Sequence, residues 1–300
     1  MGTPHDAATR AGIVSAVGAY LLWGVLPVYW KLLQSVPPLQ ILCHRIVWSV
    51  LFLAVLLGVR QEWRALVQSA RHRRTLRFYG LAAALLAVNW FTYIWAVNSG
   101  RIVESSLGYF INPLVSVLFG VVWLGERLGR LQWLAIGLAA AGVSYLTWDY
   151  GRPPWVALLL ATSFGLYGLV KKKAPLGALA GLSLETAALF LPALAWIGWA
   201  EKTGGAHFGE ASWALRALLI GTGVVTALPL LLFAHAARRV KLSTMGLLQY
   251  LAPSCQLLIG VVVYGEPFGR SRAVGFSIIW IALAAYWTAS VRQIRRSRGA

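Results

Sequence analysis

"RIVESSLGYFINPLVSVLFGVVWLGERLGR", residues 101–130, decides the fold because the chain repeats it 140 positions later. Residues 241–270 read "KLSTMGLLQYLAPSCQLLIGVVVYGEPFGR", and the two stretches align without a gap. Ten of the thirty positions are identical, including Pro113 with Pro253 and Glu126 with Glu266. Apolar composition alone does not readily align a proline, a G-V-V triplet and a G-E-x-x-G-R motif together. The pattern therefore indicates an internal duplication.

The composition is typical of a protein whose solvent is lipid. Hydrophobic residues make up 59% of the 300 residues and charged residues only 12%, about half the usual share in soluble domains. A helix needs roughly 20 apolar residues to cross the hydrocarbon core of a bilayer. Long unbroken apolar runs favour helices over the alternating strands of a membrane barrel. Ten segments meet the length requirement: 12–33, 38–59, 76–98, 103–125, 130–148, 154–172, 179–200, 212–236, 243–265 and 271–290.

The duplication divides these segments into two halves, residues 1–150 and 151–300, with five predicted helices each. Because five is odd, the second half enters the membrane upside down relative to the first. The predicted fold is an all-α integral membrane protein with ten transmembrane helices in two inverted five-helix repeats. Inverted repeats are typical of secondary transporters, which bind substrate near the midplane between the halves. A duplication kept for stability alone, in a non-transporting membrane scaffold or assembly protein, is the alternative.

The net charge of +18 raises the question of a nucleic-acid partner, and the placement of the charges argues against one. If the N-terminus is cytoplasmic, nineteen Lys and Arg residues fall on the cytoplasmic side and seven on the outer side. Arg45, inside a helix, completes the 27. This bias follows the positive-inside rule and predicts a multi-pass protein of the bacterial inner membrane with both termini in the cytoplasm. The expected partners of the basic loops are anionic lipid headgroups.

Several segments resemble a known family. The chain is similar to the RarD branch of the EamA family, in the drug/metabolite transporter superfamily, over nearly its whole length. The resemblance implies a ten-helix bacterial inner-membrane permease with two inverted five-helix repeats, each an EamA-like unit. The segments that carry it are "AYLLWGVLPVYWKLL", "ILCHRIVWS", "AVNSGRIVESSLGYFINPLVSVLFGVVWLGERL", "TALPLLLFAHAARRVKLSTMGLLQYLAPS" and "GFSIIWIALAAYW".

Arg45 lies inside an apolar segment, where a charged side chain costs several kcal/mol unless it finds water or a partner. One interpretation is that it reaches back to the outer headgroups, since it lies only about 10 Å from the start of its helix. The other is that it faces a cavity and binds an anionic substrate group or a carboxylate. Glu104, on the same outer side, is the candidate carboxylate.

The 140-residue shift places Glu185 over Arg45 and Lys171 over Lys31. Inversion puts Glu185 in the inner half of its helix. It either pairs with Lys172 or Lys173, or lines the inner half of the path as a titratable carboxylate that carries a coupling proton.

The other candidate substrate-binding side chains are polar or aromatic groups within apolar segments. Tyr109 and Gln249 are equivalent under the shift, and both precede the matched prolines, which free backbone carbonyls one turn earlier. Such groups either surround a central cavity or form hydrogen bonds between helices. The full set is Trp23, Tyr93, Asn98, Tyr109, Asn112, His235, Gln249 and Tyr250.

The sequence shows no HExxH, GxSxG or P-loop motif and no Cys/His cluster, so we expect neither an enzyme nor a metal or other cofactor. The predicted function is a secondary-active or facilitative permease. It moves a small polar or amphipathic metabolite or drug by alternating access.

Overall fold

The computed structural model describes residues 4–99, 102–150, 153–205, 208–265 and 269–298. The side chains of residues 4–6, 94, 97–98, 102–106, 149–150, 272 and 290–298 are not among them. The described residues form helices and short connections, with no β-strand. The helices are α1 (Pro4–Leu32), α2 (Pro38–Val59), α3 (Trp63–Ala70), α4 (Arg73–Asn98), α5 (Ile102–Leu124), α6 (Arg130–Tyr150), α7 (Trp155–Lys172), α8 (Ala178–Lys202), α9 (Trp213–Ala237), α10 (Leu242–Leu248), α11 (Leu251–Leu258) and α12 (Arg270–Arg298), with a π-helical turn η1 (Ile259–Val263) directly after α11.

Each predicted apolar segment is helical over most of its length, but segment 243–265 is interrupted. Pro253 has no N–H to give to the carbonyl of Gln249, one turn earlier. That carbonyl accepts the Ala252 N–H instead, at 3.1 Å, which is the tighter spacing of a 3₁₀ turn. The proline predicted from the sequence to free a backbone carbonyl therefore divides this helix into α10 and α11.

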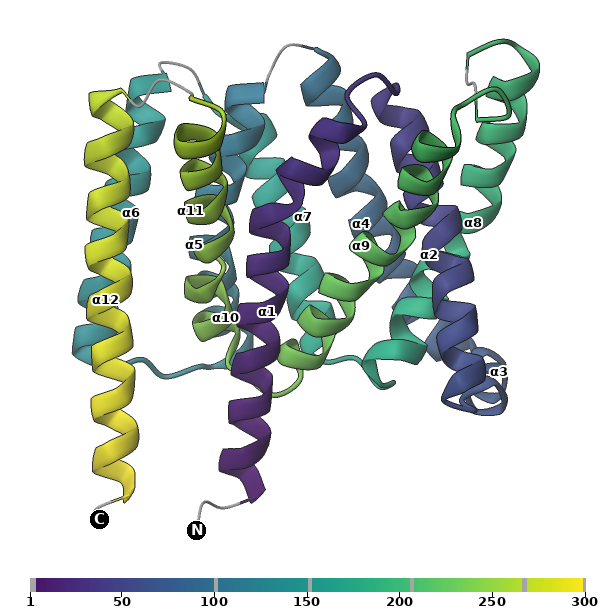
Figure 1. Ribbon diagram of the computed structural model, residues 1–300. Coiled ribbons are helices and arrows are strands. Elements are labelled where there is room, and N and C mark those ends of the chain that lie inside the picture. Colours follow the sequence, from purple (N-terminus) through teal and green to yellow (C-terminus); the bar gives the residue numbers. More distant parts are fainter. Residues whose placement is uncertain (1–3, 100–101, 151–152, 206–207, 266–268, 299–300) are drawn as a thin grey trace.

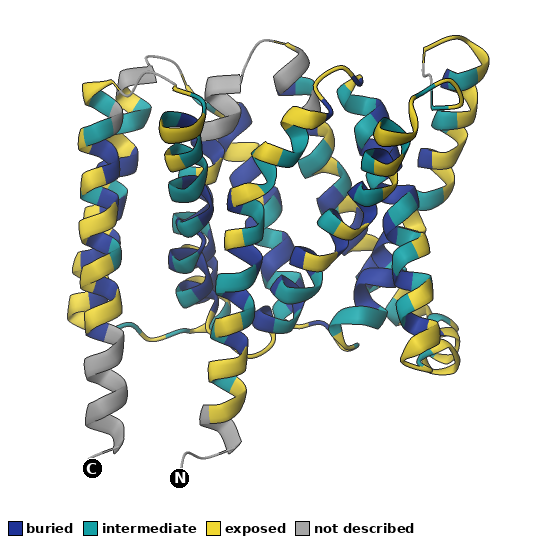
Figure 2. Ribbon diagram, in the orientation of Figure 1, coloured by how far each residue is buried: buried dark blue, intermediate teal, exposed yellow. Residues whose placement is uncertain are grey.

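Seven helical stretches among the described residues are long and apolar enough to cross a membrane. Their outer faces carry large exposed hydrophobic side chains such as Leu134, Leu191 and Val262, at 69%, 71% and 76% exposure. Figure 2 shows exposed positions along the peripheral helices α8 and α12. Apolar surface of this extent is buried by lipid in a membrane protein. The seven stretches are Ala7–Leu32, Pro38–Val59, Leu107–Leu124, Arg130–Trp148, Ala178–Lys202, Trp213–Ala237 and Leu242–Val263, and the shorter Ala273–Ala289 is also apolar.

The long helices run up and down the bundle, so that α1 begins and α12 ends at the same end (Figure 1). We call this the termini end, and the other the opposite end. α2 packs on α8 and α9, α1 packs on α9 and α11, and α7 packs on α4 and α5. α4 also contacts α8, α5 contacts α10, and α6 pairs with α12 at one edge of the bundle. The helices that surround the centre of the bundle thus come from both halves of the sequence.

The short helix α3 was not among the predicted elements. It lies at the termini end (Figure 1) and buries only Leu66, while Trp63 and Val67 are 45% and 49% exposed. Eight residues are too few for an apolar run to be recognised in a sequence, so the sequence pattern predicts only a connection here.

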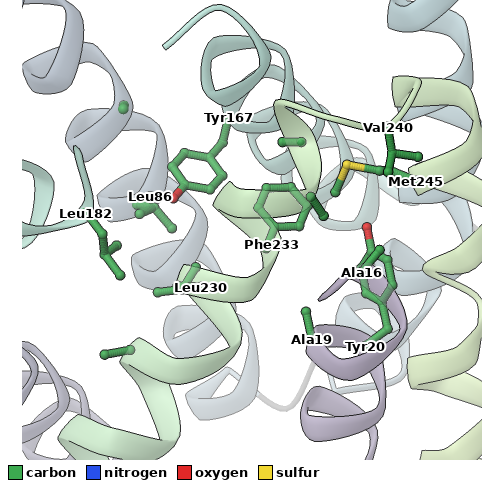
Figure 3. Packing of buried hydrophobic residues seen from close by; sticks show 14 of the residues in the cluster. Ala16, Ala19, Tyr20, Leu86, Tyr167, Leu182, Leu230, Phe233, Val240 and Met245 are labelled. Atoms are coloured by element: carbon green, nitrogen blue, oxygen red, sulfur yellow. The ribbon is translucent and has the colours of Figure 1, made fainter. Parts of the chain in front are cut away.

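An aromatic core closes the centre of the bundle toward the termini end. The rings of Tyr20 and Phe233 meet edge to face at 6.4 Å between centroids, and Tyr167 stacks on Phe233 at 5.9 Å. Figure 3 shows these rings from α1, α9 and α7 converging, with Leu86, Leu230 and Met245 around them. Aromatic rings bury large apolar areas in fixed orientations, so this cluster is well packed. We call the rings of Tyr20, Tyr167 and Phe233 the aromatic floor.

Candidate functional site

A cavity of about 410 Å³ lies above this aromatic floor. Its walls come from both halves of the chain, and its size is within the range of small-molecule sites in proteins. Lys31, in the last turn of α1, is exposed and lines the cavity, so the cavity reaches the opposite end of the bundle. The lining residues that bear on the chemistry are Tyr20, Trp23, Trp30, Lys31, Arg45, Asn89, Trp90, Tyr93, Tyr109, Asn112, Phe164, Thr226, Gln249 and Gln256.

Arg45 lines this cavity. Its Nε donates a hydrogen bond to the Thr226 hydroxyl on α9, at 3.0 Å. Its guanidinium carbon lies 4.9 Å from the centroid of the Trp30 ring and 5.1 Å from that of Trp90. Two ring faces and one hydrogen bond orient the group, and no other hydrogen bond of the guanidinium to a described side chain is recorded.

The aromatic side chains predicted from the sequence surround the same space. Tyr93 and Tyr109 lie 6.3 Å apart between ring centroids, and each is 37% exposed because it borders the cavity. Trp23 extends the floor, with its ring 5.8 Å from Phe164 and 5.8 Å from Phe233. Such walls favour a ligand with an apolar body.

Two polar atoms of the lining have no hydrogen-bond partner among the described residues. They are the hydroxyl of Tyr20, which is fully buried, and the side-chain oxygen of Asn112, which is 5% exposed. Asn89, in contrast, donates to the Leu160 carbonyl at 2.9 Å and to the Ser163 hydroxyl at 3.0 Å, so its amide is engaged between helices. An unpaired buried polar group costs about 1–3 kcal/mol, but both atoms have almost no accessible surface, so neither is presented to the open space of the cavity.

The structure brings six of the predicted binding residues to one cavity, and they are Trp23, Arg45, Tyr93, Tyr109, Asn112 and Gln249. It places Glu185, His235 and Tyr250 elsewhere. The side chains of Asn98 and Glu104 lie outside the described residues, and the proposed pairing of Glu104 with Arg45 stays a prediction.

Glu185 forms a buried ion pair away from the cavity. Its carboxylate lies 2.7 Å from the Lys171 ammonium and accepts a hydrogen bond from the Tyr167 hydroxyl at 3.0 Å. The side chains of Lys171 and Glu185 are 2% and 0% exposed. The sequence analysis named Lys172 or Lys173 as the partner. Lys172 instead donates to the Val240 carbonyl, because successive helical residues point about 100° apart.

His235 and Tyr250 serve interhelical or local contacts. Tyr250 is fully buried and its hydroxyl donates to the Phe110 carbonyl at 3.0 Å. His235 lies in the last turn of α9, half-buried, and its carbonyl accepts a hydrogen bond from Arg239 at 3.0 Å.

Further contacts close the termini end of the bundle. The Glu126 carboxylate, after α5, accepts the backbone N–H groups of Leu242 and Ser243 at 2.6 and 2.9 Å. The Tyr79 hydroxyl accepts the Leu176 N–H at 2.9 Å, and Arg238 donates to the Leu176 carbonyl at 2.8 Å. The cavity is thus sealed toward the termini and reaches the opposite end.

Sequence reasoning did not single out Thr226, Trp90 or Tyr20 as site residues. Each is of a type common in membrane helices, and its presence in the cavity follows from the face that its helix presents. The described residues also include no group of three or more His, Cys, Asp or Glu side chains that could hold a metal ion.

The comparisons with known proteins point to one family. The model of the EamA-like transporter family matches residues 10–148 and again residues 153–288. The chain is 46% identical to "Protein RarD" of Streptomyces exfoliatus, over 96% of this chain and 92% of that protein. It is 46% identical to "Uncharacterized transporter YojE" of Bacillus subtilis (98% and 99% covered) and 41% identical to "Protein RarD" of Escherichia coli (96% and 98%).

The fold also has a solved counterpart. A chain titled "Crystal structure of protein" superposes with a TM-score of 0.67 at 19% identity, over 94% of this chain and 97% of that one. At this identity the likeness concerns the fold alone. The family matches and the apolar helices together identify a multi-pass bacterial membrane protein of the transporter class. The chain belongs to the EamA-like transporter family, within its RarD branch.

Proposed function

We propose that the protein is a secondary-active or facilitative permease that moves a small polar or amphipathic metabolite or drug across the bacterial inner membrane by alternating access. The observation that carries the proposal is the cavity around Arg45. It holds a charged group and aromatic walls inside a bundle whose outer faces are apolar. Intramembrane charge that faces an internal cavity is typical of a substrate path.

The helix contacts support two inverted five-helix repeats, residues 1–150 and 151–300. The 140-residue shift relates α1 to α7, α2 to α8, α4 to α9, α5 to α10–η1 and α6 to α12. It therefore exchanges the packed pair α1–α9 with α4–α7, and α5–α7 with α1–α11. The pairs α2–α8, α5–α10 and α6–α12 each join a helix to its own equivalent. This is the contact pattern expected for two copies related by a two-fold axis.

The proposal of alternating access is supported by the difference between the two ends of the bundle. The cavity reaches the opposite end, while Glu126, Tyr79 and the aromatic floor close the termini end. In two related repeats, exchanging the conformations of the halves would close the first end and open the second. With the positive-inside orientation, the described conformation is open to the outside and both termini lie in the cytoplasm.

The coupling proton is a finer part of the proposal. Glu185, facing Lys171 and Tyr167 with Tyr79 nearby, is the candidate proton-binding carboxylate at the closed end. Flux driven by a pH gradient that is lost in Glu185→Gln supports this coupling. Flux that ignores both the gradient and the substitution argues against it.

The decisive experiment reconstitutes the purified protein in liposomes and screens labelled metabolites for flux. We expect at least one compound to move, and Arg45→Gln to slow its flux at least about tenfold, as expected for a lost charge-assisted hydrogen bond. Lys202→Gln, at an exposed lysine outside the cavity lining, is the matched control and leaves the flux unchanged. Absence of flux for every compound, with the protein folded, favours the alternative of a membrane scaffold or assembly protein.

A further inference from the structure

Two equivalent pairs of positions in the two halves carry different charges. The 140-residue shift pairs Lys31 with Lys171 and Arg45 with Glu185. The family model matches the chain twice at a similar offset, at 10–148 and 153–288. In the second half the two positions hold a cation and an anion, which form the buried 2.7 Å ion pair. In the first half they hold two cations, and both line the cavity.

In the first half, Lys31 and Arg45 have no carboxylate partner among the described residues. The Nε of Arg45 donates a hydrogen bond to Thr226, and its guanidinium group lies over the rings of Trp30 and Trp90. The Lys31 ammonium lies 3.6 Å from the centroid of the Tyr264 ring. No acidic residue is among those found to line the cavity in the part of the chain that the structure describes. An anion beside the half-buried Arg45 is favourable, because an uncompensated charge away from water is costly, and the exposed Lys31 adds a second positive charge at the same cavity.

We propose that Lys31 and Arg45 bind the carboxylate of an organic anion, which supplies the negative charge that Glu185 supplies to Lys171 in the second half. This assignment rests on the proposed transport function and names its substrate class. The planar guanidinium presents parallel N–H donors that fit a carboxylate at two points, and the lysine adds a second positive charge. The cargo is then a small amphipathic organic acid.

The remaining lining fits the rest of such a molecule. Trp23, Trp30 and Trp90 offer apolar faces for its body. A cationic ligand would instead meet two like charges, which disfavours amines as cargo.

Matched acids, amides and amines test the charge assignment. Phenylpropionate, indole-acetate and hexanoate are compared with their amides and with amines of the same carbon skeleton. Binding to the full chain in a nonionic detergent is followed by tryptophan fluorescence and by the thermal unfolding midpoint. We expect at least one acid to bind about tenfold or more tightly than its amide and its amine, the ratio for a charge-assisted contact.

Four variants connect that preference to the two cations. Arg45→Gln should abolish the preference for the acid, and Lys31→Gln should reduce it. Arg45→Glu should fold, since it can pair with Lys31 as Glu185 pairs with Lys171, and should bind no acid. The control Lys202→Gln should keep the full preference, because Lys202 lies outside the cavity lining.

Three results overturn the assignment. The first is equal or weaker binding of every acid relative to its amide. The second is acid binding that appears only in Glu104→Gln, which would make Glu104 the resident partner of Arg45. The third is an Arg45-dependent stabilisation by phosphatidylglycerol and by none of the acids, which would make the anion a lipid headgroup.

The failure of this inference is separable from failure of the permease function. Liposome flux of a neutral or cationic compound, with no acid preference in detergent, would support the permease function and contradict the anion-binding assignment. Acid binding that requires Arg45, with no flux of any bound acid in liposomes, would support the anion-binding site and contradict the permease function.

Discussion

The hydroxyl of Tyr250 donates a hydrogen bond to the carbonyl of Phe110 at 3.0 Å, and the two residues are equivalent under the 140-residue shift. A contact between equivalent residues lies close to the axis that relates two copies. Helix α5, which contains Phe110, also packs on α10, which ends just before Tyr250. In the proposed arrangement of two repeats, the bond therefore joins the two halves near their common axis.

Tyr250→Phe removes this hydrogen bond and keeps the ring. We expect a loss of about 0.5–1.5 kcal/mol of folding free energy, the usual net value for one internal hydrogen bond. Thermal unfolding in detergent measures it, with Tyr145→Phe on α6 as the control, since Tyr145 is 42% exposed. Equal midpoints for both variants would show that the Phe110 contact contributes nothing.

Glu126 makes the second connection between the halves. Its carboxylate accepts the N–H groups of Leu242 and Ser243 at the start of α10, where an anion interacts favourably with the helix dipole. The site is tight: a Cβ at Gly120 would lie 2.8 Å from the Glu126 carboxylate. Glu126→Gln keeps the shape and removes the charge.

We expect Glu126→Gln to cost about 1–2 kcal/mol, since hydrogen bonds to charged groups are worth more than neutral ones. It should also raise the labelling of a cysteine placed at the termini end of the cavity, because it weakens a contact that closes this end. Glu62→Gln is the control, because Glu62 makes no side-chain cap bond at the start of α3. Unchanged stability and labelling would assign Glu126 no part in closure.

The Lys171–Glu185 pair lends itself to a double-mutant cycle. Glu185→Gln or Lys171→Met leaves one buried charge alone and should cost about 3–5 kcal/mol. The double variant Lys171→Met/Glu185→Gln removes both charges and should be closer to wild type in stability than either single variant, because a buried pair often contributes little net free energy. Chemical unfolding of the four proteins gives the coupling energy, and additive losses would contradict the pairing.

The sequence predicted the helical segments well because their signal is local. An apolar run of about 20 residues can satisfy its backbone in lipid only as a helix, whatever its neighbours do. The interruption at Pro253 did not follow from the proline alone, since the equivalent Pro113 lies inside the uninterrupted α5. The alignment of the repeat also relates residues 140 positions apart, which hydrophobic patterns within one segment do not.

The face that each side chain presents was not predictable from the sequence. Arg45 could have reached the headgroups or an internal cavity, and only the packing of α2 on α9, next to Thr226, decides between the two. Glu185 was correctly placed in a helix, yet its partner Lys171 differs from the two lysines named in advance. Neighbouring residues of a helix lie at almost the same depth in the membrane but point about 100° apart, so depth alone does not identify the partner.

Gly223 permits the closest approach of two helices. A Cβ at this position would lie 2.4 Å from the backbone carbonyl carbon of Trp48, where α9 crosses α2. Because backbone atoms cannot turn away as a flexible side chain can, Gly223→Ala must separate the helices. We expect a loss of about 3 kcal/mol, the upper part of the range for overpacking.

Gly198→Ala is the matched control, since no atom lies within 4 Å of a Cβ built there. It should leave stability unchanged or raise it by up to about 1 kcal/mol, the intrinsic preference of alanine over glycine in a helix. Thermal unfolding of both variants is the measurement. Similar midpoints for the two would mean that α2 and α9 are not in such close contact.

Labelling of single cysteines tests the orientation of the bundle in the membrane. The two native thiols are first replaced, as Cys43→Ala and Cys255→Ala. Gln68→Cys, in the exposed face of α3 at the termini end, should react with an impermeant maleimide only after the cells are opened. Thr203→Cys, exposed after α8 at the opposite end, should react in intact cells. The reason is the excess of Lys and Arg near the termini end, which retains those loops in the cytoplasm. Labelling of both positions from the same side would contradict the alternating helix directions, and the reverse pattern would place the termini outside.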